Sequence, residues 1–175
     1  MILTILQHVP VWVYGLLFAL IALGVSQSFA RSATLRRVSV VPLVLLGWSL
    51  SGVSSSFGAS PWVAWGLLAW AAGVAGSVLL VRERIYVSSV RFDAATRRFE
   101  LPGSWLPLVL MLALFALKFA AGVSLGMAPE LRQSLPFVVT ASLAFGAFSG
   151  AFLARALALW SLARVALGNR PGLVA

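Results

Sequence analysis

The chain has 175 residues, of which 61% are apolar and only 10% are charged. Soluble domains are nearer half apolar and about a quarter charged. With a mean hydropathy of +1.02, this chain has too few ionised groups to cover a surface that faces water. The composition excludes a soluble enzyme and predicts one domain, residues 1–175, of a small polytopic membrane protein.

The formal net charge is +9, which in a soluble protein would suggest a nucleic-acid partner. Here the arginines fall between hydrophobic runs and form no basic stripe, so we expect no nucleic-acid binding. The chain contains no cysteine and one histidine, His8. These counts exclude disulfides and thiolate metal sites, and we expect neither a metal nor a cofactor.

Five hydrophobic runs follow one another along the chain. Each has about 20 residues, the length that crosses a hydrocarbon core about 30 Å thick at 1.5 Å per residue. The first has no basic residue before it and is too long for a signal sequence, so we interpret it as a retained helix. The sequence therefore predicts an all-α bundle of five transmembrane helices, at about Val9–Phe29, Val38–Phe57, Trp62–Val81, Trp105–Leu125 and Leu135–Ala154.

The cations are distributed unequally between the two sides of this five-helix arrangement. Eleven arginines fall on one side, in segments 31–37 and 82–104 and from Arg155 onward, and Arg132 lies alone on the other. Positive loops stay in the cytoplasm. We therefore predict a multi-pass protein of the bacterial inner membrane, with its N-terminus outside and its C-terminus in the cytoplasm.

The longest polar segment is the cytoplasmic loop 82–104. Its broken period of two, in Ile85, Val87, Val90 and Phe92, favours a short β-hairpin. A lone hairpin is marginal in water, so the loop is either a connector held at the lipid headgroups or a docking element for a soluble partner. Nothing breaks helical character after residue 154, so the last helix can extend to Gly168.

Catalysis has little support in the sequence. The four acidic residues lie in predicted loops, so no carboxylate is available for a proton relay within the membrane. His8 is isolated near the N-terminus, and Ser51 and Ser54–Ser56 have no histidine or lysine nearby in the sequence to activate them. We predict that the protein is not an enzyme.

Small residues recur at helical spacing in the last two predicted helices. Such surfaces let two backbones approach closely in lipid, where apolarity alone drives no association. The sequence leaves two alternatives open, which are close packing within one subunit and a homo-oligomer formed through the fifth helix. The glycines concerned are Gly146 and Gly150 in the fifth helix and Gly122 and Gly126 in the fourth.

Lys118 is the only charge well inside a predicted span, about 8 residues or roughly 12 Å from the outer end of the fourth helix. A cation at such depth costs about 2.5–3.5 kcal/mol unless it reaches the headgroups or finds partners. Either the side chain snorkels to the outer surface, or its ammonium holds an anion within an interior polar site. Counting depth along each helix predicts the partners in such a site as Tyr14, Ser49, Ser51, Trp70, Thr140 and Ser142.

The stretch from the loop into the fourth helix resembles a known group of sequences. Pro102-Gly103-Ser104-Trp105, followed by Lys118-Phe119 and Gly122-Val123, is similar to small uncharacterised bacterial inner-membrane proteins. In that group a basic loop leads through Pro-Gly-Ser-Trp into a helix that carries Lys-Phe before Gly-Val. A more distant likeness is to CcdC-type membrane proteins linked to cytochrome c maturation. The resemblance implies an accessory role and carries over no catalytic residue.

Two functional hypotheses follow from the sequence. The first is a non-catalytic accessory or assembly subunit whose partners are the lipid bilayer and another membrane protein or a second copy of itself. The alternative is a small permeation or binding unit for an anion or polar solute around Lys118. The direction of that side chain separates the two, since an interior ammonium favours binding and a lipid-facing one favours the accessory role.

Overall fold

A computed structural model of the chain describes residues 11–29, 31–82, 91–93, 98–101 and 103–168. Five α-helices occur in these ranges, and their bounds agree with the five predicted runs to within three residues at nearly every end. The exception is the last helix, which continues to Gly168 as the sequence allowed. The helices are α2 (Val11–Ser28), α3 (Leu35–Phe57), α4 (Val63–Arg82), α5 (Leu106–Met127) and α6 (Leu135–Gly168).

Serine and proline residues mark the connections between these helices. The Ser60 hydroxyl accepts the Trp62 amide at 3.2 Å just before α4, and the Ser104 hydroxyl accepts the Leu106 amide at 3.3 Å at the start of α5. Both bonds satisfy an amide that has no partner within its helix. Between α5 and α6 the chain makes one short 3₁₀ helix, η1 (Pro129–Gln133), which begins at a proline.

Three of the five helices are long and apolar enough to cross a membrane: α4, α5 and α6. The uninterrupted apolar part of α2 is shorter, covering Val13–Ser26. The α3 segment carries Arg36 and Arg37 in its first turn and six serines along its length, which makes it more polar than the other helices. The described structure is therefore that of a helical protein with three helices able to span a membrane by length and composition, while crossings by α2 and α3 stay a prediction.

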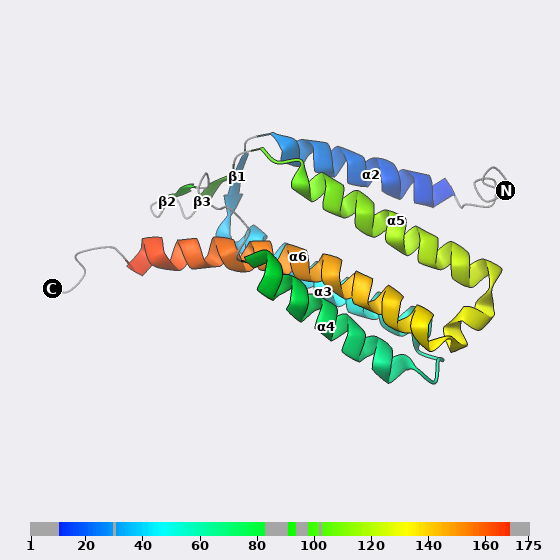
Figure 1. The fold of residues 1–175 in the computed structure, drawn as a ribbon. Helices are drawn as coiled ribbons and strands as arrows, with labels where there is room; N and C mark the ends of the chain where they lie inside the picture. The colour runs from blue at the N-terminus through cyan, green and yellow to red at the C-terminus, as the bar shows by residue number, and fades with distance from the viewer. Residues whose placement is uncertain (1–10, 30, 83–90, 94–97, 102, 169–175) are drawn as a thin grey trace.

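The helices form two groups that meet near η1. The most extensive helix pair is α4 with α6, and α3 packs along α6, whereas α2 packs chiefly on α5 (Figure 1). The turn between α3 and α4 lies at the η1 end, where the Trp62 indole donates to the Gln133 carbonyl at 2.9 Å. A bond between residues 71 positions apart ties the two connections together at this end.

A small antiparallel sheet lies at the opposite end of the bundle. It consists of β1 (Arg31–Thr34), β3 (Arg98–Leu101) and β2 (Arg91–Asp93), in that spatial order. The predicted hairpin in loop 82–104 is confirmed by the pairing of β2 with β3 around Phe92 and Phe99. Residues 83–90, 94–97 and 102 of that loop lie outside the described residues.

The third strand, β1, was not predicted. It joins the hairpin with Ala33 opposite Phe99, and the Phe99 side chain is completely buried. A third strand supplies the stability that a two-stranded hairpin lacks. It also places the arginine-containing strands Arg31–Thr34, Arg91–Asp93 and Arg98–Leu101 at one end of the bundle.

The last helix extends well beyond the predicted span. With 34 residues it is about 51 Å long, and it continues unbroken past α4 and alongside the sheet (Figure 1). On this extension the Trp160 indole donates to the Ser39 hydroxyl at 2.6 Å, and Arg164 lies 5.2 Å from the centre of the same indole. The described part therefore packs against α3 instead of bending away from the bundle.

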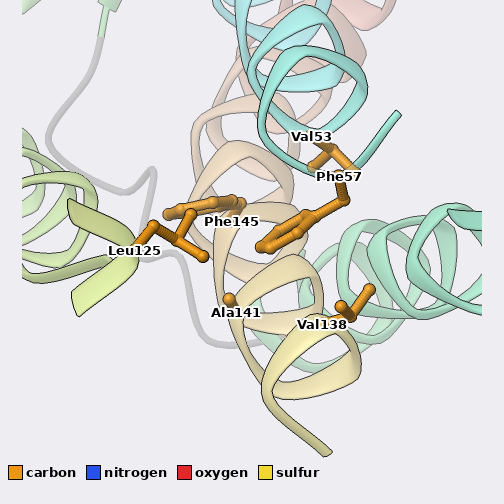
Figure 2. Packing of buried hydrophobic residues seen from close by; sticks show 6 residues of the cluster. All are labelled: Val53, Phe57, Leu125, Val138, Ala141 and Phe145. Atoms are coloured by element: carbon orange, nitrogen blue, oxygen red, sulfur yellow. The ribbon is translucent and has the colours of Figure 1, made fainter. Parts of the chain in front are cut away.

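The main hydrophobic core lies toward the η1 end, between α3, α5 and α6. Figure 2 shows Leu125 of α5 and Phe145 of α6 turned toward Phe57 of α3. Phe57 also meets Phe137 edge to face, with ring centroids 6.2 Å apart. This core fixes the depth and orientation at which α5 meets the α3–α4–α6 group.

Candidate functional site: an intramembrane ammonium

Lys118 extends from α5 toward two other helices. Its Nζ atom lies 5.2 Å from the centre of the Phe145 ring on α6. On α3, a Cβ atom added to Gly52 would lie only 2.6 Å from Nζ, so the absence of a side chain at this position makes room for the ammonium. The Lys118 Cα lies nine residues, or about 13 Å, from the end of α5.

The ammonium has no hydrogen-bond or carboxylate partner within the part of the chain that the structure describes. The ammonium makes a cation–π contact with the Phe145 ring, and the side chain is half-buried. A cation–π contact returns about 0.5–2 kcal/mol, depending on how far the cation is desolvated. The insertion cost of a lysine is about 2.5–3.5 kcal/mol. The charge is therefore incompletely compensated by the protein.

A chain of hydrogen bonds surrounds the backbone of Phe145. The Trp70 indole donates to the Ser49 hydroxyl at 3.1 Å, and that hydroxyl donates to the Phe145 carbonyl at 3.3 Å. The Ser149 hydroxyl donates to the same carbonyl at 2.8 Å. These bonds link α3, α4 and α6 at one residue. The Phe145 carbonyl accepts the serine hydrogen bonds, and its ring contacts the ammonium.

Two of the remaining predicted site residues have other surroundings. Ser142 is fully buried, has no hydrogen-bond partner, and faces Gly66 on α4. Thr140 is exposed on α6, and Tyr14 lies on α2. Of the predicted set, the structure brings Lys118 and Ser49 to a common residue, but no hydrogen bond joins them.

Two important members of the site were not predicted. Gly52 makes space for the ammonium, and Phe145 supplies both its ring and its carbonyl. Neither residue type is unusual in an apolar helix, so nothing in the sequence distinguishes them from ordinary packing residues. The charged residue was the one clear signal.

Ser49 and Ser142 are expected to respond in opposite directions to alanine. Ser49→Ala leaves the part-buried Trp70 N–H without its acceptor and should lower the unfolding free energy by about 1 kcal/mol, within the range for hydrogen bonds between membrane helices. Ser142→Ala removes a buried hydroxyl without a partner and should be neutral or stabilising by about 1 kcal/mol. Thermal unfolding in one detergent measures both, and a larger loss for Ser142→Ala would contradict the hydrogen-bond assignment.

The two pairs of glycines have different surroundings. A Cβ on Gly146 would overlap the Trp70 carbonyl, and a Cβ on Gly150 would lie 2.6 Å from the Val74 carbonyl. Both contacts are with α4 of the same chain. Nothing lies within 4 Å of a Cβ added at Gly122 or Gly126. The first pair therefore supports close packing within one subunit, and the second has no packing partner in the described structure.

These features are those of a small helical membrane protein with a lysine side chain between its helices. The chain belongs to DUF6622, a family of unknown function whose sequence model matches residues 1–169. No curated protein and no solved structure matches it.

Proposed function

We propose that the chain is a non-catalytic inner-membrane protein that binds a small anion, or the anionic group of a larger molecule, at Lys118. The observation that carries this proposal is the position of the ammonium against Gly52 and Phe145. It lies between helices, its charge is uncompensated by a carboxylate in the described residues, and glycine leaves space beside it. An anion would supply the missing countercharge in a medium where that interaction is strong.

The proposed topology agrees with where the polar segments lie. The strands β1, β2 and β3, which begin at Arg31, Arg91 and Arg98, share one end of the bundle, and α6 runs past this sheet. The opposite end carries the turn between α3 and α4 and the η1 helix, and Arg132 is the one basic residue among the described residues of these two connections. We assign the sheet end to the cytoplasm on the eleven-to-one arginine bias.

Reporter fusions test this topology. A reporter fused after Ala175 should be active in the cytoplasm, and one placed in the Ser54–Ser60 turn should be active outside. The reason is that both α3 and α4 must cross if segments 31–37 and 82–104 share one side. A cytoplasmic signal from the Ser54–Ser60 turn would contradict the arrangement in which all five helices cross the membrane.

An accessory role is compatible with anion binding. The sheet is the observation that favours an accessory role. Among the described strands, β1 and β2 each pair only with β3. Each therefore has one edge without a strand partner, and such edges can accept a strand from another protein. The sheet would be the docking element for a soluble partner at the cytoplasmic face.

Anion titration of the purified protein tests the proposed site. Acetate is the probe, and the readout is the midpoint of thermal unfolding in a zwitterionic detergent. A ligand that binds only the folded state stabilises it by about 2.7 kcal/mol at 100 times its Kd. The wild type should gain stability with acetate, and Lys118→Met should show no gain beyond the general effect of salt. Equal responses from the two proteins would overturn the proposal.

A further inference from the structure

An open apolar groove lies between α5 and α6. It has a volume of 160 Å³ and is lined by Leu110 on α5 and by Ala147, Phe148 and Ala151 on α6. None of these side chains can form a hydrogen bond or carry a charge. The groove therefore suits a hydrocarbon chain and offers nothing to a polar solute.

The groove and the ammonium share one face of each helix. Leu110, Leu114 and Lys118 are spaced four residues apart, which places them in one row along α5. On α6, Phe148 follows Phe145 by three residues and lies on the same side. Leu114 packs against the core cluster that contains Phe145. The cation thus lies at one end of an apolar row about 12 Å long, measured from Leu110.

We propose that the natural ligand of this site is a long-chain carboxylate drawn from the bilayer, with its carboxylate at Lys118 and its alkyl chain in the α5–α6 groove. The inference rests on the proposed anion site and names its ligand class. Charge complementarity selects an anionic head, and the apolar lining selects a hydrocarbon tail. The groove volume equals that of roughly five water molecules in the liquid, which accommodates part of one chain and not a pair.

The route of entry supports the same choice of ligand. The groove is open, and its lining side chains belong to helices long enough to cross a membrane. A ligand already dissolved in the lipid reaches it laterally. A small hydrated anion meets the same dehydration cost at the ammonium but gains no contact with the apolar lining.

The decisive experiment compares acetate, octanoate, palmitate and the uncharged hexadecanol in nanodiscs of zwitterionic lipid. The readout is the side-chain NMR signal of Lys118, the only lysine in the chain. Palmitate, expressed by its total concentration, should have an apparent Kd at least about tenfold below that of acetate, because removing two methylene groups from water, into the bilayer and the groove together, already supplies that factor. Hexadecanol should leave the lysine signal unchanged, since it carries no charge.

Variants that fill the groove supply the matched test. Ala151→Phe, with Leu110→Trp as a second obstruction from α5, should weaken palmitate binding by about tenfold or more, because the added ring occupies the space of the alkyl chain and overpacking costs about 1–3 kcal/mol. Acetate binding should stay intact. Ala71→Phe adds the same bulk to an exposed position on α4 and should change neither. The thermal midpoints of all three variants report whether they fold.

The remaining outcomes show whether the lipid inference alone fails or the anion site fails as well. If acetate and palmitate bind equally, or if the groove variants retain full palmitate affinity, the anion site stands and the lipid inference is wrong. If hexadecanol shifts the lysine signal as strongly as palmitate does, the carboxylate is not recognised and the inference is wrong. If no anion shifts the signal, the proposed function fails with it.

Discussion

Replacing Gly146 with alanine should destabilise the protein, whereas the same change at Gly122 should not. A methyl group at position 146 would overlap the Trp70 carbonyl, a backbone atom that can move only if α4 and α6 separate. Overpacking of this kind costs about 1–3 kcal/mol. Leucine at position 146 or 150 should cost more, because several additional atoms must enter the same contact.

Gly122→Ala is the matched control. It changes the same residue type, within the same spacing motif, at a position where nothing lies within 4 Å of the added Cβ. Alanine is the better helix former by about 1 kcal/mol, so this variant should be neutral or slightly more stable. Thermal unfolding in detergent measures both variants. Equal losses would mean that Gly122 contacts another molecule, and no loss at Gly146 would contradict the α4–α6 contact.

Lys118→Met should separate stability from ligand binding. The variant keeps the unbranched stem and removes an insertion cost of about 2.5–3.5 kcal/mol, while it forfeits a cation–π contact worth about 0.5–2 kcal/mol. The net expectation is a protein more stable by roughly 1 kcal/mol in the absence of ligand. Ser49 keeps its bonds to Trp70 and Phe145, so no buried polar group loses its partner. The same variant should lose the stabilisation by acetate.

Gly52→Ala tests the site without altering the charge. The new methyl group would lie 2.6 Å from the Nζ atom of Lys118 and would force the ammonium to move. The anion response should weaken although Lys118 is still present. Lys118→Arg is the complementary variant, because it keeps a positive charge but presents a planar fork where a compact ammonium fits. A full anion response in both variants would show that charge alone, without this geometry, is sufficient.

The helices could be predicted from the sequence because each is an apolar run closed by serine, proline or charged residues. In a membrane the length of such a run is set by bilayer thickness, so the bounds follow closely. The strand β1 could not be predicted in the same way. Arg31–Thr34 is short and lacks an alternating apolar pattern, and it becomes a strand only because β3 lies beside it.

The candidate site was predictable in part, for a similar reason. A lone lysine in an apolar helix is evident in the sequence, but its neighbours come from helices that are distant along the chain. Depth counting placed Thr140 and Ser142 together, although two residues along a helix turn the side chain by about 200°. The structure accordingly leaves Thr140 exposed and buries Ser142. The direction of a side chain around its helix depends on how the helices pack, and depth along the helix carries no information about that packing.

The most direct test of the central claim is the NMR signal of the Lys118 side chain during a titration with palmitate in nanodiscs. Because the chain has one lysine, labelling that residue type reports on this ammonium without overlap from other side chains. We predict a saturable shift that is absent with hexadecanol. It should be weakened in Gly52→Ala, where the ammonium is displaced. A lysine signal that is unchanged at saturating palmitate and acetate would contradict an anion site at Lys118.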